Sequence, residues 1–453
     1  MMETLHAQRA HYLSGATRDP LFRIEALRKL QISLRRHEAA LLAALKADLG
    51  KSPEEAYMTE LGVIYGELRH AIRRLRAWSR PRYVPPSIGQ FPGYGRILRD
   101  PYGVVLILSP WNYPAQLSLV PLISAVAAGN CAILRPSSLA PKTAAVLDAV
   151  LRESFTPTHA ALILGDRDTA RRLTALPFDK IFFTGSPAAA REVMAAASRN
   201  LVPVTLELGG KSPVIVAADA DIRLASRRVI WGKCLNAGQT CVAPDYVLVQ
   251  KSMENALLEA LRQEIHAQFG QDPVSSPDLP SIINRGHYER LEGLLQGGRL
   301  ICGGQSDPLR LKIAPTVLAG IGEGDPVMQE EIFGPILPVL PFLTMEDAIK
   351  SVRSRPAPLA LYLFTSDRDA ARRVTRDLAF GGGCVNDCVM QMASHRLPFG
   401  GVGESGMGAY HGRAGFACFT REKSVFVGSG SVDIPLRYAP RKGRLGVFKK
   451  VLR

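Results

Sequence analysis

Residues 103–134 read GVVLILSPWNYPAQLSLVPLISAVAAGNCAIL, and this stretch decides the fold. It carries no charged side chain, so a membrane span is one interpretation of it. However, Pro110, Pro114 and Pro121 interrupt it before about 20 continuous apolar residues accumulate. The pattern therefore favours a buried strand, a loop, a core helix and a second buried strand.

Apolar runs of the same kind recur along the next part of the chain, with helix-like segments between them. They begin at residues 103, 131, 161, 180 and 204, so consecutive starts lie 28, 30, 19 and 24 residues apart. This spacing is typical of strand–helix–strand units and predicts a doubly wound parallel α/β sheet, Rossmann-like in character. Later strands are expected at PVIVA (213–217), YVLVQ (246–250) and ALYLF (360–364).

The turn after the run KIFF (180–183) is a candidate site for a dinucleotide. Gly185 and Ser186 lie in this turn, and a helix-like segment begins near Pro187. The free N–H groups and the dipole of a helix N-terminus favour a pyrophosphate at this position. No G-x-G-x-x-G fingerprint occurs here, so a plain strand-to-helix turn is an equally open interpretation.

Composition and charge exclude several classes of protein. The 453 residues, 47% of them hydrophobic and 21% charged, suit a globular chain of two or three domains. The net charge of +15 is spread over many arginine pairs, which favours solvated helix faces over a nucleic-acid stripe. Seven cysteines without a C-x-x-C pair argue against a zinc site or a disulfide scaffold. With no secretory signal at the N-terminus, we expect a reducing, cytoplasmic location and no metal site.

Two short strings carry the expected chemistry, NAGQTC at residues 236–241 and ELGGK at residues 207–211. Cys241 alone could be an inert buried thiol, but a thiolate in this context can attack a carbonyl carbon and later leave from a thioester. Glu207, followed by two glycines, can activate the water that hydrolyses that thioester. The side-chain amide of Asn112 and the backbone N–H of Cys241 are candidate oxyanion donors.

Six strings together resemble the aldehyde dehydrogenase superfamily. They occur in that family's order across about residues 20–425. The strings are PWNYP (110–114), FFTGS (182–186), ELGGKSP (207–213), NAGQTC (236–241), EEIFGP (330–335) and PFGG (398–401). The segments at 355–367 and 405–420 are most similar to the class 3 branch.

This resemblance implies roles for individual residues. Cys241 would be the nucleophile, Glu207 the general base and Asn112 the oxyanion donor of an NAD(P)-dependent enzyme that oxidises an aldehyde to its acid. The expected cofactor residues are Arg135, Ser138, Gly185, Ser186, Glu331 and Phe333. Trp231 and His411 would lie near the aldehyde tunnel, whereas Lys211 would form a structural ion pair.

The resemblance also implies a domain plan and an assembly. Residues 1–80 and 101–207 would form the cofactor-binding domain, and residues 208–404 the catalytic domain. Residues 81–100 and 405–453 would form a small β bridging and oligomerisation element with a basic C-terminal tail. A homodimer and medium or long aliphatic or aromatic aldehydes are typical of class 3 relatives.

The chain departs from the family at its ribose-binding string, which reads RPSS at residues 135–138 in place of KPSE. Ser138 removes a carboxylate that would repel a 2′-phosphate, and Arg135 can pair with phosphate through its planar fork. This departure predicts that NADP is accepted at least comparably with NAD. Ala190 replaces a second glycine of the family's turn and predicts a slightly shifted helix.

Two other functions stay open on the sequence alone. One is an acylating dehydrogenase that passes the thioester to coenzyme A, although such a transfer does not need Glu207. The other is a protein that binds anionic surfaces on a dehydrogenase scaffold. A compatible version gives the basic tail at residues 437–453 a peripheral membrane contact, because Leu445, Val447, Phe448, Val451 and Leu452 lie among its cations.

Overall fold

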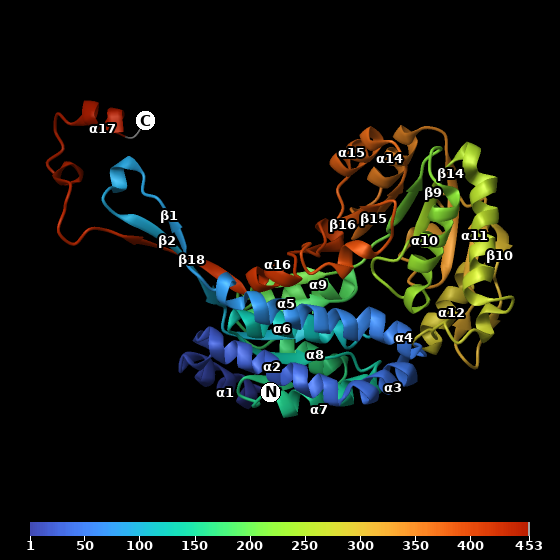
Figure 1. Ribbon diagram of the computed structural model, residues 1–453, viewed down its shortest axis with the longest axis horizontal. Coiled ribbons are helices and arrows are strands. Elements are labelled where there is room, and N and C mark those ends of the chain that lie inside the picture. Colours follow the sequence, from blue (N-terminus) through green and yellow to red (C-terminus); the bar gives the residue numbers. More distant parts are fainter. Residues whose placement is uncertain (452–453) are drawn as a thin grey trace.

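Two α/β lobes and one extended arm make up the chain (Figure 1). The computed structural model describes residues 1–451. A six-stranded sheet forms the centre of the first lobe, a seven-stranded sheet the centre of the second, and a three-stranded antiparallel sheet the arm. One buried apolar cluster includes side chains of both large sheets, such as Ile107 and Val214, so the two lobes pack against each other.

The first lobe confirms the parallel α/β sheet that the apolar runs predict. Its strand order is β17-β7-β6-β3-β4-β5, and every pairing is parallel except that of the short β17 with β7. The strands are β3 (Val104–Leu108), β4 (Cys131–Arg135), β5 (Ala160–Leu162), β6 (Lys180–Thr184), β7 (Val204–Glu207) and β17 (Gly406–Met407).

The charge-free stretch is a strand, a loop, a helix and a strand, as predicted. The helix α6 (Gln116–Ala128) is buried along its whole length with Pro121 inside it, and it packs on α5, α2 and α16. Within residues 1–451 we find no helix whose length and apolar character would allow it to cross a bilayer. The prolines and the packing partners explain why this stretch is a core element.

Helices surround the first sheet, and local sequence sets several of their ends. Asp19 caps α2 by accepting a hydrogen bond from the backbone N–H of Leu21, with Pro20 at the first helical position. The remaining helices of this lobe are α1 (Met2–Leu13), α2 (Pro20–Arg36), α3 (Glu38–Leu49), α4 (Pro53–Ala56), α5 (Gly62–Trp78), α7 (Pro141–Ser154), α8 (Arg167–Thr174), α9 (Pro187–Ser198) and α16 (Gly412–Cys418).

The second lobe contains a seven-stranded sheet of order β10-β13-β14-β9-β8-β15-β16. Its strands are β8 (Pro213–Val216), β9 (Tyr246–Gln250), β10 (Arg299–Cys302), β13 (Thr316–Ala319), β14 (Ile336–Phe342), β15 (Ala360–Phe364) and β16 (Gly382–Val385). Its helices are α10 (Ile222–Cys234), α11 (Glu254–Phe269), α12 (Arg285–Leu294), α13 (Pro326–Gln329), α14 (Met345–Arg353) and α15 (Arg368–Asp377). A two-stranded ribbon joins β11 (Ser306–Asp307) to β12 (Lys312–Ile313).

Three strands of the seven-stranded sheet match the sequence prediction, and its other four were not predicted. The runs at 213, 246 and 360 are β8, β9 and β15. By contrast, β14 lies between β13 and β9 but contains Pro338 and Pro341, which would normally argue against a central strand. Burial of the strand within the parallel sheet overrides that local signal.

The arm pairs β2 (Tyr94–Pro101) with β1 (Arg82–Val84) on one side and β18 (Thr420–Val427) on the other. The tail follows and ends in α17 (Leu445–Val451). The predicted plan assigns residues 405–453 to the arm. In the structure, however, β17 pairs with β7 and α16 packs on α6 and α5. We therefore propose that the boundary between the first lobe and the arm lies near residue 420.

Candidate active site

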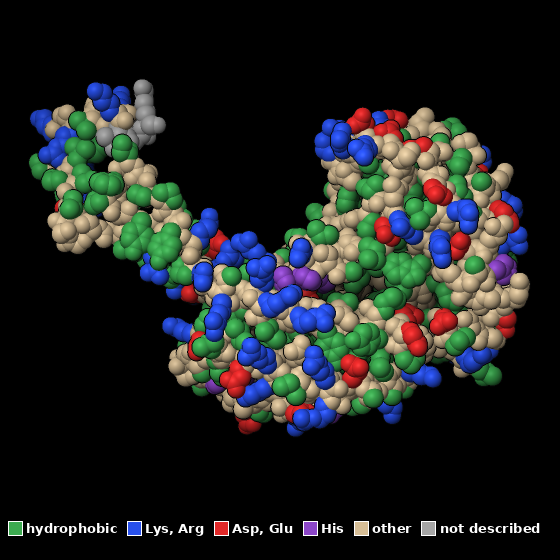
Figure 2. Space-filling view, viewed as in Figure 1, with side chains coloured by type: hydrophobic (Ala, Val, Ile, Leu, Met, Phe, Trp, Pro, Cys, Tyr) green, Lys and Arg blue, Asp and Glu red, His purple; other side chains and the backbone are tan. Residues whose placement is uncertain are grey.

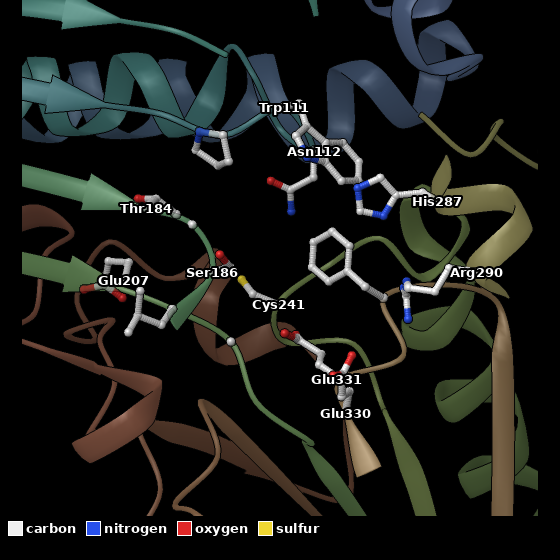
Figure 3. A pocket seen from close by; sticks show the side chains of 15 residues that line it. Trp111, Asn112, Thr184, Ser186, Glu207, Cys241, His287, Arg290, Glu330 and Glu331 are labelled. Atoms are coloured by element: carbon white, nitrogen blue, oxygen red, sulfur yellow. The ribbon is translucent and has the colours of Figure 1, made fainter. Parts of the chain in front are cut away.

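A pocket of about 310 Å³ opens beyond the carboxyl ends of β3, β6 and β7, where the two lobes meet (Figure 3). Open parallel sheets bind ligands at this edge. The structure brings seven of the residues predicted from the sequence to the wall of this pocket. They are Asn112, Gly185, Ser186, Glu207, Cys241, Glu331 and Phe333.

Cys241 reaches the pocket because the loop before it folds tightly. Asn236, Ala237 and Gly238 have φ values of 53°, 52° and 75°, so three successive residues adopt the left-handed region. A Cβ on Gly238 would lie 2.2 Å from the carbonyl oxygen of Gly334, so only glycine fits there. The loop thus places the thiol in the pocket rather than in the core (Figure 3).

The surroundings of Cys241 keep its thiol protonated in the cofactor-free protein. Burial raises the pKa of the thiol, and the carboxyls of Glu331 and Glu207 raise it further. The backbone N–H groups of Cys241 and Val242 act in the opposite direction, because they lie where they can stabilise a negative charge. A nucleophile in this position must therefore lose its proton during the reaction.

Glu207 ends β7 and is a carboxyl group without a fixed partner. Its side chain is buried, and among the described residues neither carboxyl oxygen has a hydrogen-bond partner. Burial raises its pKa well above the usual value, because desolvation disfavours the ionised form. Buried polar groups are usually paired, and an unpaired carboxyl in a pocket is a candidate acid or base.

Asn112 lies in the loop that follows β3, and it is tied to the loop of Cys241. Its Nδ2 donates to the carbonyl of Gln239 at 3.0 Å, and Nδ2 of Asn236 donates to the Asn112 carbonyl at 2.8 Å. A side-chain amide has two N–H donors, so the second remains for a ligand. The loops that carry the predicted oxyanion donors are therefore held together directly.

A buried ion pair also holds the loop that carries Asn112. Lys51 and Glu60 are fully buried, with 2.7 Å between Nζ and Oε1, and Lys51 also donates to the Asn112 carbonyl at 3.1 Å. The other carboxyl oxygen of Glu60 accepts from the backbone N–H groups of Ala115 and Gln116. Each charge is thus compensated, and the pair fixes the chain between Asn112 and α6.

Replacing Lys51 with methionine is expected to destabilise the protein by about 3–5 kcal/mol, because Glu60 would remain buried without a counter-charge. Chemical unfolding followed by tryptophan fluorescence measures this loss. Lys51→Met/Glu60→Gln should regain part of the lost stability. The unpaired charge of Glu60 disappears in this variant, while the amide oxygen of the glutamine still accepts hydrogen bonds. Lys29→Met, in the exposed pair with Glu25, is the matched control. Equal effects at Lys51 and Lys29 would contradict the role of the pair.

The pocket also suits a dinucleotide. Ser186 caps α9 by accepting from the N–H of Ala189, and Gly185 precedes it at the end of β6. The hydroxyl of Thr184 is buried without a hydrogen-bond partner among the described residues, and it lines the same pocket. A helix N-terminus and a free buried donor match the anionic and hydroxyl groups of such a cofactor. Ala190 is buried in this helix, as its place in the turn requires.

Glu331 faces Cys241 from the second lobe (Figure 3). A Cβ on Gly209 would lie 2.2 Å from Oε2 of Glu331, so the carboxyl occupies the space that this glycine leaves free. Burial, with a smaller contribution from Asp245, raises the pKa of Glu331 to about 8. This carboxyl can accept hydrogen bonds from ribose hydroxyls, as the sequence predicted, once it is ionised.

Lys211 is structural, as predicted. It forms an ion pair with Asp245 and donates to the carbonyls of Val327 and Glu330 at 2.9 Å each. Asp245 in turn accepts from the N–H of Ile332 at 2.9 Å. These bonds hold both ends of the Glu330–Ile332 segment, so they position Glu331.

Four predicted residues lie outside this pocket. Arg135 ends β4, where its Nη2 donates to the carbonyls of Gly165 and Asp166, and Ser138 follows it in an exposed loop. Trp231 is half-buried on α10 against the core. His411 is buried with Nδ1 3.6 Å from Glu67, and it lines a different cavity. Trp231 and His411 thus lie away from the walls of this pocket, and their place near an aldehyde tunnel stays a prediction.

Sequence reasoning missed other residues of the pocket wall. Trp111 packs against the rings of His287 and Phe333, with centroids 5.3 and 5.5 Å apart. His287 and Arg290 come from one face of α12, where they lie three residues apart. That i,i+3 pair of a histidine and an arginine was the available signal, but nothing in the sequence links α12 to β3.

Comparisons with known proteins agree with this geometry. The sequence model described as "Aldehyde dehydrogenase family" matches residues 5–425. The chain is 44% identical to 4,4′-diaponeurosporen-aldehyde dehydrogenase of Staphylococcus aureus, over 99% of this chain and 98% of that protein. It is 43% identical to human aldehyde dehydrogenase family 3 member B1, over 98% and 95% of the two chains. The substrate-bound structure of Staphylococcus aureus AldH superposes with a TM-score of 0.98 at 43% identity, covering 100% of this chain and 99% of that one.

Proposed function

The chain belongs to the aldehyde dehydrogenase family and is an NAD(P)-dependent aldehyde dehydrogenase most like the class 3 branch, and from this premise we propose the residues that perform the reaction. One observation carries the proposal: a half-buried thiol, an unpartnered carboxyl and a tethered side-chain amide line one pocket. We assign Cys241 as nucleophile, Glu207 as general base and Asn112 as oxyanion donor.

In the first step, the Cys241 thiolate, whose proton leaves to solvent, adds to the aldehyde carbon. The electron pair of the carbonyl moves to oxygen, and the Asn112 amide and the Cys241 backbone N–H stabilise that oxyanion. The tetrahedral carbon then loses a hydride and becomes a thioester of Cys241. The loop of Cys241 and the loop of Asn112 keep their relative position during this change because Gln239 and Asn236 join them.

A nicotinamide cofactor held in this pocket would supply the acceptor for that hydride. Glu331 and Phe333 would border its nicotinamide half, and Gly185 and Ser186 its pyrophosphate. In the last step, the Glu207 carboxylate takes a proton from water as that water attacks the thioester. The carbon–sulfur bond breaks, Cys241 leaves as a thiolate, and the carboxylic acid is released.

Product analysis tests the final step. With an aliphatic or aromatic aldehyde of medium or long chain, we expect the free acid as product both with and without coenzyme A. The reason is that the unpartnered Glu207 carboxyl is suited to activate water, whereas transfer to a thiol does not need such a base. Formation of an acyl-coenzyme A at the expense of the acid would favour the acylating alternative.

The ribose-binding string predicts the cofactor preference. We expect kcat/KM with NADP to be at least comparable with that for NAD, because Ser138 carries no charge that would repel a 2′-phosphate. Ser138→Glu should lower kcat/KM for NADP about tenfold or more relative to NAD, with little change for NAD. Steady-state kinetics with both cofactors measure the ratio. Ser137→Glu is the neighbouring control, and a strong NAD preference of the unmodified enzyme would contradict the prediction.

We propose that the enzyme acts as a cytoplasmic homodimer in which the two lobes are the cofactor-binding and catalytic domains. The arm supports an assembly role, because β18 leaves one long edge of its three-stranded sheet unpaired within residues 1–451. Exposed apolar side chains on the arm also support a role in assembly. They include Tyr83, Ile88, Phe91 and Phe426.

We also propose that the basic tail contacts anionic membranes. Leu445 and Val447 are exposed in α17, and Lys449 and Lys450 follow them, so apolar and cationic side chains lie on one short segment. Leu452 lies outside the described residues. The intact protein is expected to co-sediment with phosphatidylglycerol vesicles in a salt-sensitive manner, and a chain that ends at residue 436 is not. Equal binding of the two proteins would contradict this role.

A further inference from the structure

A strongly basic cleft lies outside the active-site pocket, at the base of the hollow between the arm and the second lobe. In Figure 2, histidine side chains gather at the base of this hollow with lysine and arginine side chains around them. Two cavities of about 520 and 360 Å³ form the cleft, and they share Arg74, Trp78, Arg99 and Arg413. None of these residues lines the pocket of Cys241. The proposed catalysis therefore does not account for the cleft.

The charge of the cleft is almost uncompensated. The arginines that line it are Arg74, Arg80, Arg82, Arg99, Arg396 and Arg413. No acidic side chain lines either cavity. Glu422 of β18 pairs with Arg99 at 3.0 Å and approaches Arg82 at 3.9 Å, and the other four arginines form no ion pair within residues 1–451. Several arginines in one concave surface attract an anion more strongly than isolated surface charges do.

Three histidines form the inner wall of the larger cavity. The rings of His70 and His395 are in contact, tilted by 38° with centroids 4.1 Å apart, and His70 also packs against Trp78 at 5.3 Å. Burial, followed by His395 and the nearby arginines, lowers the pKa of His70 to about 4, so this ring is neutral at pH 7. The cleft thus offers imidazole donors in addition to its guanidinium groups.

His411 supplies an independent sign of a missing ligand. It lines the same cavity, its side chain is 1% exposed, and its Nε2 has no hydrogen-bond partner among the described residues. Its other ring nitrogen faces Glu67, which also accepts from the backbone N–H of Gly412 at 3.0 Å. A buried nitrogen left without a partner is unusual in a native protein and indicates a group that binds there.

We propose that this cleft binds a phosphate-bearing anion, either free in solution or as a lipid headgroup. Guanidinium groups match phosphate oxygens in a bidentate geometry, and the neutral imidazoles can donate to the same oxygens. The cleft is a confined hollow rather than a stripe along the surface, which argues against nucleic acid. The site is separate from the pocket of Cys241 and does not depend on the proposed catalytic roles.

Titration of inorganic phosphate into the cofactor-free protein tests the proposal by calorimetry, and co-sedimentation with phosphatidate vesicles tests the lipid source. Arg74→Gln/Arg413→Gln should weaken phosphate binding about tenfold or more, because two guanidinium groups that can bind phosphate oxygens are lost. Arg73→Gln/Arg76→Gln is the matched control. It removes the same amount of charge, both from α5, the helix that carries Arg74, but these side chains do not line the cleft. In ¹⁵N-histidine spectra, phosphate should shift the resonances of His70 and His395 in the unmodified protein.

Loss of binding in Arg74→Gln/Arg413→Gln alone, with either phosphate source, supports the site, and the source that binds identifies the natural ligand. The proposal is overturned if the unmodified protein binds neither phosphate, at concentrations up to about 10 mM, nor phosphatidate vesicles. A dissociation constant above about 10 mM is too weak for specific recognition. Equal weakening in both double variants would also overturn it, since that result reports net charge only. A change in oligomeric state of Arg74→Gln/Arg413→Gln, with phosphate affinity unchanged, would show that a second copy of the chain fills the cleft.

Discussion

Cys241→Ala is expected to abolish turnover of aldehyde, with a loss of kcat on the order of 10⁴-fold or more. The thiol lines the same pocket as the carboxyl groups of Glu207 and Glu331. Without it no covalent adduct forms, and the aldehyde carbon cannot become tetrahedral before hydride loss. The absorbance of reduced cofactor, followed at saturating aldehyde, measures the rate, and intact-protein mass spectrometry should detect no acyl adduct.

Cys302→Ala is the matched control for this prediction. Cys302 lies in β10, half-buried against the core, and does not line the pocket. This variant should keep nearly full activity and accumulate the acyl adduct as the unmodified enzyme does. Steady-state activity that survives in Cys241→Ala, or that disappears in Cys302→Ala, would refute the assignment of the nucleophile.

Glu207→Gln is expected to separate the two halves of the reaction. Acylation does not need this carboxyl, so a burst of about one reduced cofactor per site should remain. Hydrolysis of the thioester needs a base, so the steady-state rate should fall by about 10²- to 10⁴-fold. Stopped-flow absorbance resolves both phases, and an acyl-enzyme should accumulate in the variant.

The pH dependence gives a second check on Glu207. Because burial raises the pKa of this carboxyl, the group is protonated below that pKa and becomes a base only as the pH increases. Steady-state turnover should therefore rise with pH, and the rise that belongs to deacylation should be absent in Glu207→Gln. Glu404→Gln, at an exposed glutamate paired with Arg191, should keep the profile of the unmodified enzyme. Loss of the burst in Glu207→Gln would show that the carboxyl acts before the thioester forms.

Much of the fold is visible in the sequence because it rests on short-range patterns. Apolar runs bounded by helix-like segments predicted β3 to β9 of the parallel sheets. The prediction failed where tertiary burial overrides local preference, as in β14 with its two prolines. The boundary between the first lobe and the arm was also harder to predict. No local sequence pattern shows that α16 packs on α5 and α6 rather than in the arm.

The candidate site was predicted where a motif carries the chemistry within a few residues. The strings at 207–211 and 236–241 contain Glu207 and Cys241, and both side chains lie in one pocket. His287 and Arg290 could not be found this way, because their place beside Trp111 depends on how the second lobe packs on the first. The expectation for His411 did not match the pocket wall for the same reason. Its side chain turns toward Glu67, a contact between residues 344 positions apart.

The sequence by itself determined the strands β3 to β9 and β15, the family and the candidate reactive side chains, because these depend on periodicity and on motifs read along the chain. Only the tertiary structure decided how deeply these side chains are buried and which contacts hold them in place. It buries Glu207 without a partner, ties Asn112 to the loop of Cys241, and places the Lys51–Glu60 pair beneath them. It also gathers six arginines from distant segments into one cleft. Desolvation and contact across the chain create these properties, and neither is encoded in neighbouring residues.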